Sequence, residues 1–198
     1  NTMNPHAGEK GRDFNEMSAW RQQEYESKAK QDLSVYAVKN PKGEMMYTLN
    51  WLPPYDWQWM FGFLGARAVT GIETVTHDYY ERSFACEGHQ GIFRVTPDIA
   101  THTLTVTLSP GLIPVAQPCL ERIERLFDLA CNPQHIAETL GDLGAARPGL
   151  RLPGAMDAYE QGVRAILGQL VSVAMAAKLA SRVVALCGEP VADCPGYL

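Results

Sequence analysis

The chain has 198 residues, of which 46% are hydrophobic and 20% are charged, values typical of a soluble globular protein with one large domain or two small ones. No apolar run approaches the roughly 20 residues of a transmembrane helix, and the polar N-terminus lacks a signal-peptide pattern. The net charge of −5 counts against a nucleic-acid partner, since such proteins usually carry a basic surface. Five cysteines without a CxxC pair indicate reduced thiols and a cytoplasmic protein. No metal-ligand spacing appears among the cysteines or histidines.

The first predicted segment, residues 1–44, is polar, with seven basic and seven acidic side chains. Residues 16–32 could form a solvated helix, in which Glu24 and Lys28 stand four residues apart. Few large apolar residues are present to stabilise such a helix. The composition therefore favours an extension that is disordered or loosely helical.

Residues 45–113 predict an α+β domain, which begins with a strand at 46–51 and a helix. Pro53 and Pro54 end the strand because proline cannot donate to a sheet ladder. Asp56 stands where a helix N-cap belongs, ahead of apolar residues at helical spacing. We therefore expect a helix to follow the first strand directly.

Three more strands are predicted at 79–86, 91–96 and 103–109, the first two joined by a glycine-bearing loop at 87–90. In the last strand, leucines and valine alternate strictly with threonines, which indicates one buried face and one solvent face. The economical assembly is an antiparallel sheet with a helix packed on one face.

Residues 114–198 predict a helical domain. Its first helix presents an apolar stripe made of Cys119, Ile123, Leu126, Phe127 and Ala130. A short helix follows at 134–140, and two longer ones at 157–167 and 172–186. Gly168 should end the former, and Ser172 should cap the latter. Residue patterns alone reveal no catalytic constellation, no phosphate loop and no metal site.

Two stretches resemble a known family. They are MYTLNWLPPYDWQWMFGFLGARA from Met46 and LGDLGAARPGLRLPGAMDAYEQGVRAILGQLVSVAMAAKL from Leu140. Both are similar to the inducible bacterial 3-methyladenine DNA glycosylases of type II, within the helix–hairpin–helix glycosylase superfamily. The resemblance runs from about Met46 to the last residue. It implies an antiparallel-sheet domain resembling half of a TATA-binding protein, followed by the first helices of an all-α glycosylase domain.

The resemblance also implies an activity. Such enzymes repair DNA by base excision: they flip an alkylated base out of the duplex and hydrolyse its N-glycosidic bond. The implied partner is double-stranded DNA containing alkylated bases, and neither a metal nor an organic cofactor is implied. The complete enzyme is expected to be a cytoplasmic monomer acting at the bacterial nucleoid.

Four positions match functional residues of the family. Leu170 matches the apolar wedge that fills the space of the flipped base, and Gln169 matches the probe of the opposite base. Phe63 matches an aromatic side chain of the base pocket, where a cationic base would stack, and Arg67 is a candidate for the pocket margin. The alternatives are a leucine buried between helices, a simple turn residue and a core phenylalanine.

The family's catalytic aspartate and glycine-rich hairpin lie beyond the matched stretch. Asp128, Asp157 and Asp193 do not match the catalytic position, and Asp157 is better interpreted as a helix N-cap. We therefore expect no catalytic residue in this chain, which would be an inactive, shortened form of the enzyme. The alternative is a non-catalytic DNA-binding or protein-interaction module derived from the glycosylase.

Two further expectations concern the ends of the domains. In the family the first long helix packs against the C-terminal part, so Ile123, Leu126 and Phe127 would lie exposed here and favour self-association.

A methyl-accepting cysteine domain precedes some relatives, but residues 1–44 contain no cysteine. Met45 or Met46 would serve as a natural start, which makes an upstream stretch read through from a mis-chosen start codon the favoured interpretation of the extension.

Overall fold

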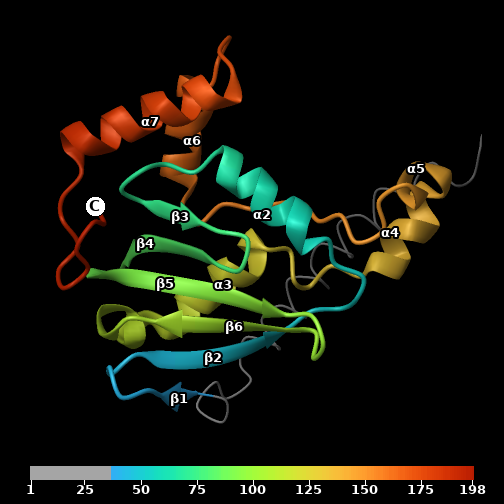
Figure 1. Ribbon diagram of the computed structural model, residues 1–198, viewed down its shortest axis with the longest axis horizontal. Helices are drawn as coiled ribbons and strands as arrows, with labels where there is room; N and C mark the ends of the chain where they lie inside the picture. Colours follow the sequence, from blue (N-terminus) through green and yellow to red (C-terminus); the bar gives the residue numbers. More distant parts are fainter. Residues whose placement is uncertain (1–36) are drawn as a thin grey trace, which may run out of the picture. The chain divides into compact units, whose positions relative to one another are not determined.

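The computed structural model describes residues 37–198, and Figure 1 shows them as a sheet with helices on it. The expectation for the polar extension falls mainly on residues 1–36, which lie outside the described part. The first strand, β1 (Val38–Lys39), already pairs with β2 (Met45–Asn50). Sheet structure therefore begins inside the segment that composition alone assigned to the extension.

The sheet has six strands in the order β1-β2-β6-β5-β4-β3, and all neighbours are antiparallel. The remaining strands are β3 (Glu73–Val75), β4 (Tyr80–Cys86), β5 (His89–Asp98) and β6 (Thr103–Leu108). This confirms the predicted α+β class and the four predicted strands, whereas the short β1 and β3 were not predicted from the sequence pattern. In β6 the leucines and valine are fully buried and the threonines half-buried, as expected.

The β4–β5 hairpin is tighter than predicted. Only Glu87 and Gly88 form its turn, with φ angles of 51° and 79°, and His89 pairs with Cys86. Positive φ at both central residues matches the right-handed twist of the paired strands, which favours two-residue loops of this kind. The strand β5 therefore starts two residues before the predicted start.

Three helical elements form the core with the sheet: α2 (Trp57–Ala66), the 3-10 helix η2 (Pro110–Val115) and α3 (Ala116–Leu126). The Asp56 carboxylate accepts from the Trp59 amide at 2.9 Å, which confirms the predicted N-cap of α2. The expectation that the α3 stripe lies exposed is wrong. Ile123 and Phe127 are 0% exposed and Leu126 is 3% exposed.

Phe127 explains that burial, because its ring contacts aromatic residues from two other elements. Ring centroids of Trp57 and Phe61 on α2 lie 5.7 and 6.5 Å away, and that of Tyr80 on β4 lies 5.6 Å away. The sheet and α2 thus cover the apolar face of α3 within this chain, so the face offers no basis for self-association.

Arg151, 2% exposed, fixes the loops around this core. Its guanidinium donates to the carbonyl oxygens of Leu52, Pro54, Asp128 and Cys131. It thereby ties the segment before α2 to the segment after α3. Nearby, Gly149 has a φ of +85°, and a Cβ atom there would come within 2.8 Å of the backbone of Pro54 and Tyr55.

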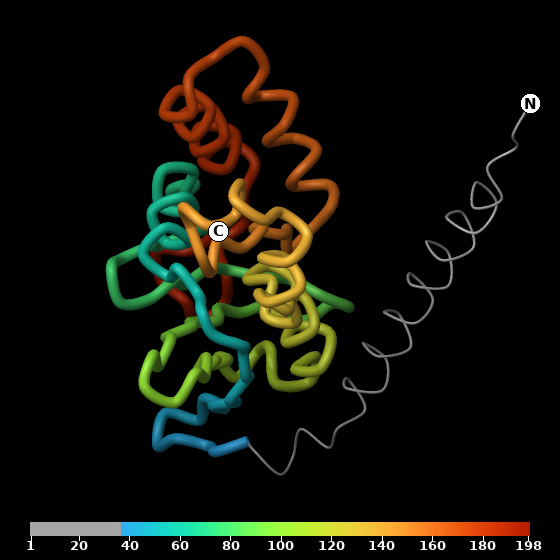
Figure 2. The backbone as a smooth tube through the Cα atoms, turned by 90° about the vertical axis from the view of Figure 1, so that its right-hand side faces the viewer, coloured from blue at the N-terminus to red at the C-terminus, as the bar shows by residue number. Residues whose placement is uncertain are grey.

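The last helices are α4 (Pro133–Leu140), α5 (Asp142–Ala145), α6 (Ala158–Leu167) and α7 (Val173–Cys187). Figure 2 shows α6 and α7 as a helical hairpin above the sheet. Asp157 and Ser172 cap α6 and α7 by accepting from the backbone amides of Glu160 and Met175, and Gly168 ends α6, all as predicted. Within residues 37–198 no helix is long and apolar enough to cross a bilayer.

Candidate functional site: a cavity beneath the helical hairpin

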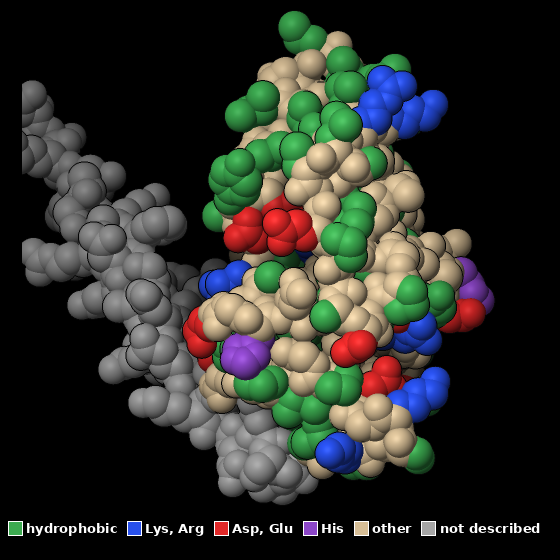
Figure 3. All heavy atoms as spheres, turned by 90° about the vertical axis from the view of Figure 1, so that its left-hand side faces the viewer, with side chains coloured by type: hydrophobic (Ala, Val, Ile, Leu, Met, Phe, Trp, Pro, Cys, Tyr) green, Lys and Arg blue, Asp and Glu red, His purple; other side chains and the backbone are tan. Residues whose placement is uncertain are grey.

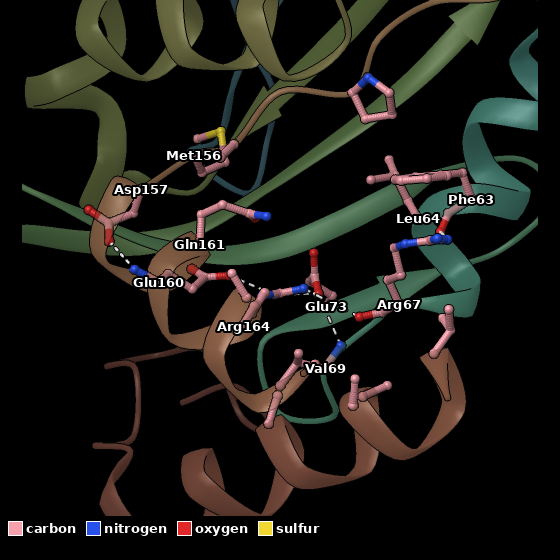
Figure 4. A pocket seen from close by; sticks show the side chains of 18 of the residues that line it. Phe63, Leu64, Arg67, Val69, Glu73, Met156, Asp157, Glu160, Gln161 and Arg164 are labelled. Atoms are coloured by element: carbon pink, nitrogen blue, oxygen red, sulfur yellow. Dashed lines mark hydrogen bonds and ion pairs between the residues drawn. The ribbon is translucent and has the colours of Figure 1, made fainter. Parts of the chain in front are cut away.

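A cavity of about 320 Å³ lies where α2, α6 and α7 meet the β3 edge of the sheet. Figure 4 shows Phe63 and Arg67 on its α2 side, with Glu160 and Arg164 facing Glu73 from α6. From α7, Val173 and three small side chains, Ala176, Ala177 and Ala180, line the cavity. Because the alanines occupy little volume, space remains between the hairpin and the sheet.

Four charged side chains form an ion-pair network at the floor of this cavity. Arg82 of β4 donates to Glu160 at 2.6 Å and lies 3.8 Å from Glu73. Arg164 of α6 contacts Glu73 at 2.7 Å and Glu160 at 2.6 Å. The side chains of Glu73 and Arg82 are 5% and 6% exposed, and the charges alternate in sign around the network. Such alternation compensates for the loss of hydration of each buried charge.

Arginines and hydrogen-bond donors surround both carboxylates of the network. Burial alone would raise the pKa of Glu160, but Arg82 and Arg164 outweigh it and hold that pKa below its usual range. Glu73 accepts further hydrogen bonds from the Tyr80 hydroxyl at 2.7 Å and from the Val69 amide at 3.0 Å. Both carboxylates therefore have all their oxygens engaged.

Phe63, predicted to belong to a base pocket, lines the cavity and is half-buried. Its ring stacks on Trp59, with centroids 5.2 Å apart. The guanidinium of Arg67, the second predicted pocket residue, lies 3.7 Å from the centroid of the Phe63 ring and donates to the Phe63 carbonyl oxygen. The Arg67 guanidinium therefore occupies the face of the Phe63 ring on which a cationic ligand would stack.

Leu170 lies at the tip of the turn between α6 and α7, and the residue is 104% exposed relative to its fully accessible reference state. Within residues 37–198 Leu170 is therefore not buried between the helices, which was the alternative interpretation of this residue. Its φ of 60° places the backbone in the left-handed region, which is uncommon for residues other than glycine. The neighbouring Gln169 is exposed and donates its side-chain amide to the Ala165 carbonyl oxygen at the end of α6. The turn is therefore a short, fixed platform that presents an apolar side chain to solvent.

The structure brings the two predicted groups close to each other. Gly168 and Val171, which flank the Gln169–Leu170 pair in sequence, both line the cavity that Phe63 and Arg67 border. The charged network was not predicted. Glu160 and Arg164 stand four residues apart on α6, a spacing that could have indicated an ion pair, but no local pattern connects them with Glu73 and Arg82.

Comparison with known proteins gives three findings. The family model described as AlkA N-terminal domain matches residues 46–157. DNA-3-methyladenine glycosylase 2 of Escherichia coli (strain K12) is 64% identical over 153 residues, which are 77% of this chain and 54% of that protein. A probable bifunctional transcriptional activator/DNA repair enzyme AlkA of Mycobacterium tuberculosis is 37% identical over 153 residues, 73% of this chain and 30% of that protein. The chain thus spans about half, or less, of the length of these relatives.

The fold also resembles a solved structure, a 3-methyladenine DNA-glycosylase from Archaeoglobus fulgidus, with a TM-score of 0.57 and 17% sequence identity. The superposition covers 70% of this chain and 50% of the other. At this identity the likeness concerns the fold.

Proposed function

This chain belongs to the family of the AlkA N-terminal domain, and from that membership we propose that it acts in base-excision repair of alkylated DNA. Its task in this proposal is to engage the duplex and turn out an alkylated base such as 3-methyladenine, so that the N-glycosidic bond can be hydrolysed. The exposed Leu170 is the single observation that carries the proposal.

Leu170 suits the part of a wedge for a physical reason. A single exposed leucine is ordinary on a protein surface, but Leu170 combines full exposure with a left-handed backbone conformation at the tip of a tight turn. Rotating a base out of a duplex costs a few kcal/mol of stacking and pairing, and an apolar side chain that fills the vacated space offsets part of that cost. Gln169 stands beside it with polar atoms that could contact the base left unpaired.

Phe63 and Arg67 are proposed to border the pocket that receives the flipped base. An alkylated purine carries positive charge, and such a cation is attracted to the face of an aromatic ring. In this proposal Arg67 leaves the Phe63 ring when the base arrives, so one cation replaces another. Glu73 and Glu160 nearby add negative charge, but their oxygens are already paired with arginines.

The ion pairs of Glu73 and Glu160 favour a second candidate function for this chain by itself. In this alternative the chain is a DNA-binding module that does not release the base. A carboxylate that stabilises the developing charge on the sugar must face the reacting bond. Around the cavity, Glu73 and Glu160 are held by arginines and Asp157 caps α6. We propose that hydrolysis depends on a carboxylate supplied from outside residues 37–198.

The test is release of 3-methyladenine from alkylated DNA by the 198-residue chain. It is compared with a version extended by the C-terminal remainder of the E. coli relative. Release by the extended protein only is the expected result. Release by the short chain would overturn the placement of the catalytic carboxylate, and failure of both proteins would overturn the repair function. Leu170→Ala in the extended protein, with Ile166→Ala as a matched exposed control on α6, links the activity to the wedge.

A further inference from the structure

We propose that Lys178 and Arg182 of α7, with Thr70 beside them, form a contact site for the phosphate backbone of DNA. The inference rests on the proposed function, and it identifies which surface beyond the Leu170 turn holds the duplex. A net charge of −5 is unfavourable for binding a polyanion, so a DNA contact requires a local excess of positive charge.

The charge is unevenly distributed along the sequence. Residues 161–188, which include α7 and the Leu170 turn, contain no aspartate or glutamate. The basic residues of this stretch are Arg164, Lys178 and Arg182. Since Arg164 is neutralised by Glu73 and Glu160, two cations remain on the same helical hairpin as the wedge.

Most other basic side chains of residues 37–198 are engaged within the protein. Arg94 pairs with Glu81, and Arg122, Arg125 and Arg151 donate to backbone carbonyl oxygens. Lys178 and Arg182 are exposed and make no ion pair or hydrogen bond with another residue of the described range. The other basic side chains of residues 37–198 without such a partner are Lys39, Lys42 and Arg147, so Lys178 and Arg182 are the two on the helical hairpin that carries Leu170. An unpaired cation is fully available to an external anion, whereas a paired one must first be released.

The two side chains also share a face of α7. They stand four residues apart, which places their Cβ atoms about 6 Å from each other on a helix. The same exposed stripe continues through Met175 to Val171, next to Leu170. Figure 3 shows basic side chains at the height of α7, beside exposed hydrophobic ones. A duplex that received the Leu170 side chain in its groove would bring its backbone along this stripe.

A shallow hollow completes the site. Its lining includes Lys178, Arg182, Thr70 and Ser181, and its volume is about 440 Å³. The Ser181 hydroxyl is already used, since it accepts from the Thr70 amide at 3.0 Å and donates to the Ala177 carbonyl oxygen at 2.8 Å. This bond fixes the loop carrying Thr70 against α7 and leaves the Thr70 hydroxyl as a donor beside the two cations. Two cations and a hydroxyl are the groups that bind phosphate oxygens.

The test is the salt dependence of binding to duplex DNA by the full chain. Each phosphate neutralised by a lysine or arginine contributes about 0.9 to the slope of log K against log salt concentration. Lys178→Ala/Arg182→Ala should therefore lower the slope by about 1.8. The matched control is Lys39→Ala/Lys42→Ala, which removes two cations near β1, where no ion pair or hydrogen bond of these side chains occurs within residues 37–198. That control should leave the slope unchanged.

The outcomes separate this inference from the function on which it rests. A lowered slope for the α7 variant with an unchanged control supports the site. A slope unchanged by the α7 variant while the wild type binds DNA overturns the site and leaves the repair function standing. Equal decreases for both variants would indicate non-specific attraction and also overturn it. If the wild-type chain binds no DNA under low salt, the site and the proposed DNA-engaging role of this chain fail together.

Discussion

The Nη2 atom of Arg164 lies 2.7 Å from Oε2 of Glu73, and this contact joins helix α6 to strand β3 across 91 positions of sequence. Because α6 leads directly into the turn that carries Leu170, the contact also fixes where the candidate wedge stands relative to the sheet. The same arginine donates to the Arg67 carbonyl oxygen at 3.3 Å, so the end of α2 is held by the same side chain. The network is thus the joint between the candidate pocket and the candidate wedge.

Removing the most buried cation of the network should destabilise the fold strongly. Arg82→Met leaves Glu73 and Glu160 without that partner, and such a loss at a buried ion pair typically costs about 3–5 kcal/mol. Arg94→Met is the control, because the Arg94 side chain is 48% exposed and its pair with Glu81 should contribute no more than about 1 kcal/mol. Urea unfolding of both variants gives the comparison, and equal losses would contradict the proposed importance of the network.

The lowered pKa of Glu160 predicts a pH dependence of a definite sign. A carboxyl with a lower pKa in the folded than in the unfolded state stabilises the fold when ionised. That contribution is fully present above the ordinary glutamate pKa of about 4.3 and is lost as the pH falls through the lower native pKa. The difference in unfolding free energy between wild type and Glu160→Gln should therefore be constant at neutral pH and shrink as the pH falls below about 4.3 toward and through that native pKa. A difference that is constant or grows toward acid would show that the Glu160 charge is not what stabilises the fold.

Leu170→Gly should separate stability from function. The residue is fully exposed and its backbone φ is 60°, so glycine loses no buried surface and relieves the strain of the left-handed conformation. We expect the unfolding free energy to stay within about 1 kcal/mol of wild type. In contrast, flipping of a target base, followed by the fluorescence of a 2-aminopurine beside it, should fall sharply. Ile166→Ala, at a 74% exposed position of α6, should leave both quantities unchanged.

Phe63 and Arg67 should have opposite effects on an alkylated base. Phe63→Ala removes the aromatic face and should weaken binding of a cationic alkylated nucleoside such as 7-methyl-2′-deoxyguanosine, whereas Arg67→Ala frees that face from a guanidinium 3.7 Å above it. The second variant should bind this nucleoside more tightly, by up to about 1 kcal/mol, the size of an exposed cation–π contact. Titration calorimetry with the nucleoside, which keeps its positive charge, measures both. Weaker binding by Arg67→Ala would instead mean that Arg67 itself contacts the base.

The burial of Phe127 could not be predicted from the sequence. The periodicity of α3 correctly indicated which of its faces is apolar, because that follows from 3.6 residues per turn. What covers the face is a property of the whole chain, and here α2 and β4 supply the aromatic partners from positions 47 to 70 residues earlier. The strands β1 and β3 were missed for a related reason, since two or three residues are too few to show alternation.

The sequence by itself determined the caps, the alternation of β6, the limits of α6 and α7 to within a residue and, through two stretches that resemble it, the family. These are local features: a side chain bonded three residues away, or a period of two or 3.6. Only the tertiary structure decided that Leu170 is exposed at a left-handed turn, that Arg67 covers the ring of Phe63, and that Glu73, Arg82, Glu160 and Arg164 share one buried network. Burial and the pairing of charges depend on which segments distant in sequence pack together. A local sequence pattern does not specify that packing.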